Sequence, residues 1–257
     1  MWNDRLMVPA QSTQKSFDVL RALAAHGAAG ASLADIADAV ALPKPTVHRL
    51  LAAMVQQGFA LRAATGRRYQ LGPEIYALAL KSQSTVGLVE TWRGALMRVA
   101  ERTGDSAFLM VRSGYDAVCL AMQEGVVSVR TLTGGTGGRV PLGIGPGSLA
   151  ILATMTEDES DTILAHNDRR LRMLVPDLPA SLPSWVERIK IDGFAQSGGL
   201  FLAEVGGVAV PVPRHLGAPE CAISTATLAS RLDEVRVAEV VAILKEEIAA
   251  VVARAGG

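Results

Sequence analysis

The sequence is poor in cysteine and histidine, and it contains no long apolar run. Its two cysteines, Cys119 and Cys221, lie far apart in apolar, strand-like stretches, which favours buried thiols over a disulfide framework. The four histidines form no H-x-x-x-H or C-x-x-C grouping, so we expect no metal site and no cofactor. No apolar run approaches the roughly 18 residues of a membrane span, and the first residues lack the apolar core of a signal peptide. The sequence therefore predicts a cytoplasmic protein.

The chain has no net charge, because 25 Lys and Arg residues balance 25 Asp and Glu residues. The two signs of charge are not evenly distributed along the chain. Residues 11–70 hold seven Lys and Arg residues against three Asp residues, and the remainder of the chain is correspondingly acidic. A positive region within a neutral chain favours contact with a polyanion, although so small an imbalance also arises by chance.

Three short helices are predicted near the N-terminus. The first runs from about Ser12 to Ala25 and ends at the glycines of "HGAAGA". The second begins at Ser32, where the spacing of Ser32 and Asp35 is that of a capping box. The third is entered through Pro45, a residue that the first turn of a helix tolerates well. Two short helices joined by about four residues form a helix-turn-helix.

The third helix, within "LPKPTVHRLLAAMVQQGF", has two unlike faces. Apolar residues recur with helical spacing, whereas the opposite face contains no acid. In a helix-turn-helix the second helix lies in the major groove and its first residues reach base edges. The expected DNA contacts on this helix are Lys44, Thr46, His48 and Arg49. The alternative is an ordinary helix pair that never touches DNA.

A basic hairpin is predicted directly after these helices. Residues 59–62 and 67–71 can pair around "AATG", with Gly66 at a turn position. Its tip carries Arg62, Arg67 and Arg68, which suit contacts with the DNA backbone or minor groove, unless they form an ordinary solvated tip. Residues 11–72 therefore read as a winged helix-turn-helix that binds a double-stranded DNA operator, preceded by a tail at 1–10.

The remaining chain alternates between helical and strand-like patterns. A linker helix is expected at 73–85, and a second helix follows with Trp92 on its apolar side. The pattern then predicts two strands around "SGYD" and a strand at "VVSVRTL". After these it predicts helices at about 148–155, 157–166 and 181–191, three further strands and a closing helix at about 232–254. The basic run "HNDRRLR" is taken as a solvated loop, with an accessory polyanion contact as the alternative. This order predicts an α+β fold with a mostly antiparallel sheet.

The N-terminal region closely resembles the DNA-binding domain of IclR-type bacterial transcriptional regulators. The resemblance is strongest in "LPKPTVHRLLAAM" and in the wing ending "YQLG". Looser similarity continues through "GGRVPLGIGPGSLAILATM" and "VAVPVPRHLGAPECAISTATLASRL". The resemblance implies a C-terminal GAF-like effector domain at 86–257, palindromic operators bound by homodimers or dimers of dimers, and a response to small organic molecules, frequently carboxylic or aromatic acids.

By position, the resemblance places an effector pocket at a helix start and on a late strand. The implied residues are Gly147, Ser148, Leu149, Ser224 and Ala226. Many members have a histidine where this chain has Gly143, a glycine–lysine pair at Ser148 and Leu149, and a second serine at Ala226. We therefore expect a less polar pocket and an aromatic or largely apolar carboxylic acid as effector. A vestigial, ligand-independent domain is the alternative.

An enzymatic reading finds no support in the sequence. The run "GGTGGRVPLGIGPGS" matches neither G-x-x-x-x-G-K-[ST] nor G-x-G-x-x-G, and it lacks a G-x-S-x-G elbow around Ser148. It is interpreted as a turn that opens a helix whose first N–H groups could hold an anion, or else as a flexible connector. We assign no catalytic residues.

Overall fold

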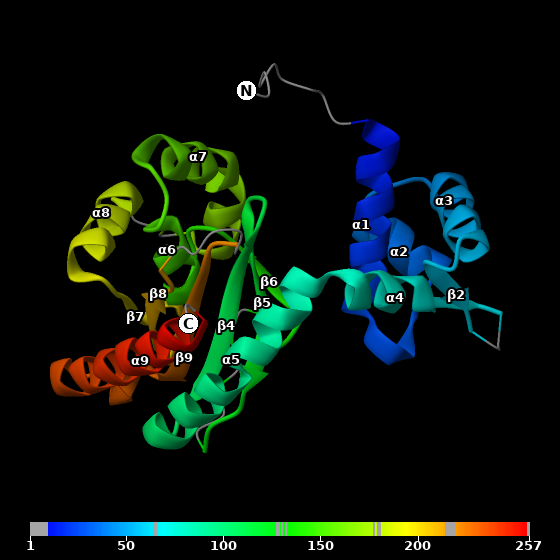
Figure 1. Cartoon of the computed structure of the whole chain (residues 1–257). Coiled ribbons are helices and arrows are strands. Elements are labelled where there is room, and N and C mark those ends of the chain that lie inside the picture. The colour runs from blue at the N-terminus through cyan, green and yellow to red at the C-terminus, as the bar shows by residue number, and fades with distance from the viewer. Residues whose placement is uncertain are drawn as a thin grey trace, which may run out of the picture. The chain divides into compact units, whose positions relative to one another are not determined.

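The computed structural model describes residues 10–63, 66–126, 129, 131, 133–176, 178, 181–213 and 219–255, with only the backbone of 83–86 and 255. The chain divides into two compact units, Met1–Val86 and Gly87–Gly257 (Figure 1). The division falls inside helix α5 (Gln83–Thr103), close to the expected end of the linker. Each unit has its own hydrophobic core, so each is described by itself.

The first unit is built on helices α1 (Gln11–Ala25), α2 (Leu33–Ala39) and α3 (Lys44–Gln56). Their apolar faces meet in a small core that contains Leu23, Ile36 and Leu51, each fully buried. The predicted capping box is present, because the N–H of Asp35 donates to Ser32 Oγ and the N–H of Ser32 donates to Asp35 Oδ2. The latter bond lowers the pKa of Asp35.

A three-stranded antiparallel sheet completes this unit. It consists of β1 (Ala31–Ser32), β2 (Ala60–Arg62) and β3 (Arg68–Leu71) in the order β1-β3-β2. The predicted hairpin is β2 and β3, and Gly66 has the expected positive φ of 69°. Strand β1 was not predicted, because two residues are too few to show an alternating pattern. Helix α4 (Pro73–Lys81) follows β3.

The second unit contains a six-stranded sheet in the order β6-β5-β4-β9-β8-β7, in which every pairing is antiparallel. The strands are β4 (Ser106–Ser113), β5 (Asp116–Gln123), β6 (Arg139–Pro141), β7 (Ala195–Leu202), β8 (Val205–Pro211) and β9 (Cys221–Leu228). Strands β4 and β9 are adjacent although more than a hundred residues separate them, with Phe108 opposite Ser224. This pairing brings two distant segments together at the centre of the sheet.

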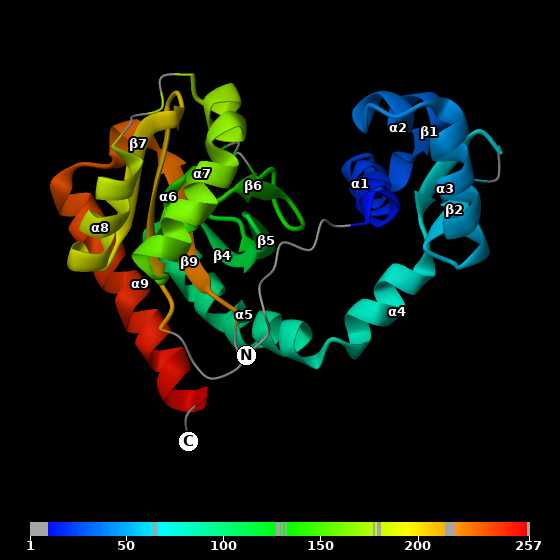
Figure 2. The ribbon, with the colours of Figure 1, turned by 90° about the horizontal axis from the view of Figure 1, so that it is seen from above.

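Helices cover both faces of the six-stranded sheet (Figure 2). Helices α5 and α9 (Glu234–Ala255) lie on one face, and α6 (Pro146–Leu152), α7 (Glu157–Leu174) and α8 (Leu182–Asp192) lie on the other. Side chains alternate between the two cores as a pleated strand requires: Leu109 packs with α5 and α9, whereas Phe108 and Met110 face α6. The α+β class with an antiparallel sheet is confirmed.

The second unit differs from the prediction at two places, and a third predicted element lies mostly outside the described residues. The run "HNDRRLR" is not a loop but part of α7, which ends at Leu174. It is helical because Asn167 and Leu171 are buried on the face of α7 that packs on the core of this unit. Strand β6 was missed inside the glycine-rich run. The strand expected at "VVSVRTL" falls mostly outside the described residues. Within the described chain, no helix is long and apolar enough to cross a membrane.

Candidate functional site

Helix α3 presents a polar face away from the core of the first unit. Val47, Leu51 and Met54 are buried on its inner side. Of the four predicted contacts, Lys44, His48 and Arg49 are exposed and Thr46 is half-buried. No ion pair or hydrogen bond joins the side chains of Lys44, His48 and Arg49 to another residue in the described part of the chain, so their donors are available to a partner.

The three arginines of the wing differ in what they already contact. Arg62 Nε donates to the carbonyl of Gly66 at 2.7 Å, and its guanidinium lies 5.8 Å from the centre of the Tyr69 ring. Arg68 Nη1 donates to the carbonyl of Gly30 at 2.6 Å, which ties β3 to the segment before α2. Arg67 is exposed and has no such bond among the described residues. Arg67 is therefore the wing cation most free to reach a phosphate.

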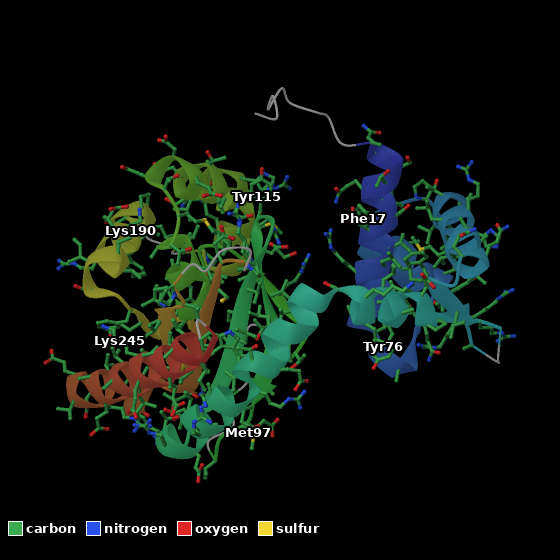
Figure 3. All side chains as sticks on the ribbon, in the orientation of Figure 1. Phe17, Tyr76, Met97, Tyr115, Lys190 and Lys245 are labelled. Carbon is green, nitrogen blue, oxygen red and sulfur yellow. The ribbon has the colours of Figure 1, made fainter. Side chains whose placement is uncertain are left out.

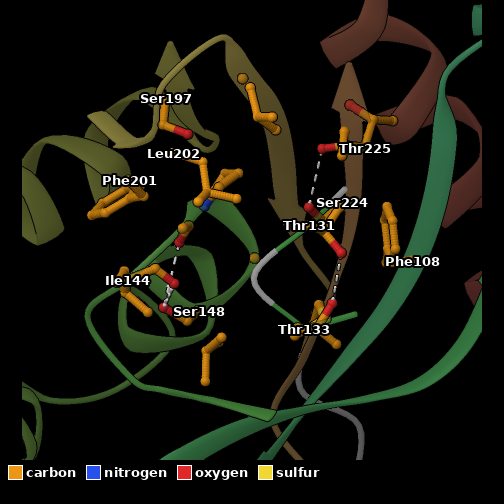
Figure 4. A pocket seen from close by; sticks show the side chains of 18 residues that line it. Phe108, Thr131, Thr133, Ile144, Ser148, Ser197, Phe201, Leu202, Ser224 and Thr225 are labelled. Atoms are coloured by element: carbon orange, nitrogen blue, oxygen red, sulfur yellow. Dashed lines mark hydrogen bonds between the residues drawn. The ribbon is translucent and has the colours of Figure 1, made fainter. Parts of the chain in front are cut away.

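A small cavity of about 90 Å³ lies in the second unit between the sheet and the start of α6 (Figure 4). Its floor is formed by strands β4 and β9, and one side by β7 and the start of β8. The lining is mainly apolar, with Phe108, Met110 and Phe201 among its members. Hydroxyl groups add hydrogen-bonding capacity; they belong to Thr131, Thr133, Ser148, Ser197, Ser224 and Thr225.

Four of the five residues implied for an effector pocket line this cavity, namely Gly147, Ser148, Ser224 and Ala226. Ser224 is buried, and its hydroxyl makes only a long bond of 3.4 Å to the carbonyl of Thr225. Its hydrogen-bonding capacity is therefore largely unspent. Leu149 does not line the cavity: it is 1% exposed and packs in the apolar core beneath α6.

The hydroxyl of Ser148 is already engaged within the protein. It donates to the carbonyl of Ile144 at 2.7 Å and accepts from the N–H of Gly143 at 3.1 Å. These bonds use its single hydrogen and one lone pair. Ser148 thus holds the turn before α6, which leaves Ser224 as the better hydroxyl for a ligand.

Several lining residues were missed by sequence reasoning. Phe108 and Met110 reach the cavity because β4 pairs with β9, and Ser197 and Phe201 reach it because β7 pairs with β8. The period-two pattern of "SAFLMVRS" does put Phe108 and Met110 on one face. It does not say which distant strand that face will meet.

The thiols of the second unit are poorly suited to chemistry. Burial raises the pKa of Cys119 to about 11 and that of Cys221 to about 12. Each thiol therefore stays protonated at neutral pH and is a weak nucleophile. Among the described residues, no three His, Cys, Asp or Glu side chains are grouped to hold a metal ion.

Comparison with known proteins matches both units to one family. The IclR helix-turn-helix domain matches residues 12–63, and the bacterial transcriptional regulator IclR C-terminal domain matches residues 80–253. The HTH-type transcriptional regulator XynR of Escherichia coli is 24% identical over 231 residues, which cover 89% of this chain and 90% of XynR.

Solved structures share the fold. A putative IclR transcriptional regulator from Silicibacter has a TM-score of 0.78 at 24% identity, covering 96% of each chain. An IclR homologue from Microbacterium hydrocarbonoxydans, complexed with 4-hydroxybenzoate, has a TM-score of 0.73 at 23% identity, covering 93% of this chain and 97% of that one. Because the two family domains match most of its length, the chain belongs to the IclR family of DNA-binding transcriptional regulators, which is not a family of enzymes.

Proposed function

We propose that this regulator binds its operator through the first turns of α3 and through Arg67, and that a small organic molecule in the cavity changes operator affinity. The observation that supports an effector is the cavity itself, which is lined both by the apolar side chains of Phe108, Met110 and Phe201 and by the hydroxyl of Ser224. Such a combination of apolar lining and few polar groups is typical of small-molecule sites. We also propose a cytoplasmic location, because that is where a bacterial operator is found.

An aromatic or largely apolar carboxylic acid remains our preferred effector class. Phe108 and Phe201 can contact a ring, and Ser224 together with the first-turn N–H groups of Gly147 and Ser148 can donate to an oxygen. The 4-hydroxybenzoate bound to the Microbacterium homologue supports a one-ring acid. The volume of about 90 Å³ limits the effector to a small molecule.

Regulation requires only a modest difference in affinity. If the effector favours one arrangement of two DNA-binding units, a coupling of about 1–3 kcal/mol changes operator affinity by roughly 5- to 150-fold. The same coupling acts in reverse, so operator DNA must change effector affinity by the same factor. This reciprocity gives a second way to detect the effector.

The first test is a thermal-shift screen of one-ring acids, followed by gel shifts with the operator. A ligand at a hundred times its Kd stabilises a folded protein by about 2.7 kcal/mol, which is readily detected. A hit that also shifts the operator titration supports the proposal. If a ligand stabilises the protein without changing its operator binding, the cavity binds a molecule that does not regulate, and the proposed coupling is excluded.

One observation favours the alternative of a vestigial, ligand-independent domain. The hydroxyl of Ser148 serves the protein's own turn, so one expected polar contact with a ligand is already occupied. If this alternative holds, no small molecule in a broad metabolite panel will stabilise the protein, while operator binding will be intact.

The wing offers a paired prediction. Arg67→Ala should weaken binding to all duplexes to a similar degree and reduce the slope of log affinity against log salt by about 1, because one phosphate contact is lost. Arg68→Ala should instead lower the melting temperature of the first unit, since Arg68 bonds to Gly30. Fluorescence anisotropy from about 50 to 200 mM salt and thermal unfolding distinguish the two. An unaltered slope for Arg67→Ala would exclude that contact.

We further propose that the protein self-associates through α4. This helix buries none of its residues, and Tyr76, Leu78 and Leu80 are 68%, 48% and 55% exposed. Tyr76 on α4 is labelled in Figure 3. Phe17 on α1 is also exposed in the same unit. So many exposed apolar side chains on a nine-residue helix support a protein contact at this surface, and we propose that another copy of the chain covers it. Two copies would also supply the two recognition helices that a palindromic operator needs.

Leu78→Glu should shift the protein toward monomer and weaken operator binding at least tenfold, because a carboxylate in a buried apolar interface is costly. Lys81→Glu adds the same group further along α4 in place of a polar side chain and should leave the assembly nearly intact. Analytical ultracentrifugation measures both variants. Equal molar masses for wild type and Leu78→Glu would exclude α4 as the interface.

A further inference from the structure

The turn between β6 and α6, residues Leu142–Gly145, forms one wall of the cavity through Ile144 and Gly145. Gly143 and Gly145 both have positive φ, at 115° and 78°. A turn with two such glycines has little conformational preference of its own. Its shape must therefore be fixed by contacts with other parts of the chain.

Ser148 fixes this turn from the side of α6. Its hydroxyl bonds to the N–H of Gly143 and to the carbonyl of Ile144. Ser148 is 1% exposed, so water does not compete for these bonds. This contact alone leaves the carbonyl of Leu142, at the start of the turn, without a partner from α6.

Asn167 fixes the turn from the other side. It is fully buried on α7, and its Nδ2 donates to the carbonyls of Leu142 at 3.0 Å and Tyr115 at 2.7 Å. The N–H of Leu142 also donates to the Tyr115 carbonyl, at 3.0 Å. One amide therefore joins α7, the β4–β5 turn and the cavity wall.

The orientation of this amide is set by Arg170. The guanidinium donates to Asn167 Oδ1 at 3.1 Å and is itself 2.7 Å from Asp116 Oδ1. A cation at the oxygen leaves the NH₂ group to face the two carbonyls, which is the orientation that gives both ends of the Asn167 amide a partner. Buried amides are costly unless paired in this way, so the arrangement is strongly specified.

We propose that Asn167 is a positioning residue of the effector cavity, acting through Leu142 on the wall formed by Ile144 and Gly145. No residue of α7 is among the described residues that line the cavity, so Asn167 acts without touching the ligand. This inference rests on the proposed effector function. It adds that effector affinity depends on a side chain in α7, and that Ser148 and Asn167 work on the same four-residue turn.

The experiment compares Asn167→Ala with Ser160→Ala in the full chain. Ser160 is also a buried polar residue of α7, but its hydroxyl donates to Glu157 within the same helix. Binding of 4-hydroxybenzoate, benzoate and phenol is measured by calorimetry, well below the unfolding temperature of each variant. We expect Asn167→Ala to weaken binding about tenfold or more, with Ser160→Ala unchanged.

The double variant Ser148→Ala/Asn167→Ala tests whether the two residues act on ligand affinity through the same turn, a result that general destabilisation of the fold would not give. Because both residues hold one turn, their effects on ligand affinity should be less than additive. Hydrogen exchange at the Gly143 amide supplies a measurement without ligand: Asn167→Ala should accelerate it, and Ser160→Ala should not.

The outcomes separate this inference from the function on which it rests. If wild type binds a probe and Asn167→Ala binds it equally well, Asn167 is only a structural residue and the inference is overturned. If wild type binds none of the probes and no molecule of the metabolite panel, the effector site itself is overturned. Weaker binding by Ser160→Ala to the same degree as Asn167→Ala would show a general effect of destabilising α7 and would also overturn the inference.

Discussion

Arg49→Ala is expected to weaken operator binding by about 1–3 kcal/mol, which is roughly 5- to 150-fold, and to relax sequence preference at one base pair. Arg49 is exposed near the start of α3, opposite the buried side chains of Val47 and Leu51. In the described chain its guanidinium has no intramolecular partner, so it is free to bond a base edge. A bidentate bond to guanine is the commonest specific contact that arginine makes.

Two further variants make this experiment specific. Gln56→Ala changes an exposed residue at the far end of α3 and should leave binding unchanged. Arg49→Lys keeps the charge but loses the fork of donors, so it should retain non-specific binding and lose discrimination. Thermal unfolding of Arg49→Ala should match wild type because the side chain supports no packing. Equal gel-shift affinities for wild type and Arg49→Ala would remove Arg49 from the interface.

The DNA-binding unit could be predicted well because its signals are local. Ser32 and Asp35 cap one helix across three residues, and the buried residues of α3 recur within a single helix. The same approach could not show that Arg62 and Arg68 are engaged internally, since Arg68 bonds to Gly30, 38 residues away. The charge of an arginine and its place on a polar face can be predicted from sequence. Whether its guanidinium is available to DNA depends on the tertiary contacts that it already makes.

The cavity was predicted less completely because it is assembled from distant segments. Gly147 and Ser224 were identified only through the family resemblance, and they meet because α6 packs on β9. The internal bonds of Ser148 could not be predicted: a serine in the first turn of a helix can face a ligand or bond to the preceding turn, and sequence does not distinguish these. The helical nature of the basic run was missed because buried Asn167 does not look apolar.

Gly147→Leu is expected to abolish effector binding, with a loss of about a hundredfold or more, while operator binding is retained. The reason is the close approach of α6 to the sheet. A Cβ on Gly147 would lie 2.8 Å from Met110 Cγ and 3.3 Å from Ser224 Cβ. A leucine must therefore displace Met110 or extend into a cavity of only about 90 Å³. The DNA-binding elements belong to the other compact unit and are not altered.

Gly198→Leu is the matched control for Gly147→Leu. Gly198 lies on edge strand β7 beside the cavity, and a Cβ there meets nothing within 4 Å. Both variants are tested by calorimetry with 4-hydroxybenzoate and by operator titration with and without it. Removing a glycine from a helix recovers up to about 1 kcal/mol of helix propensity, which offsets part of the steric cost, and thermal unfolding checks that Gly147→Leu is folded. If Gly147→Leu still binds and responds to the acid while remaining folded, the effector occupies some other site.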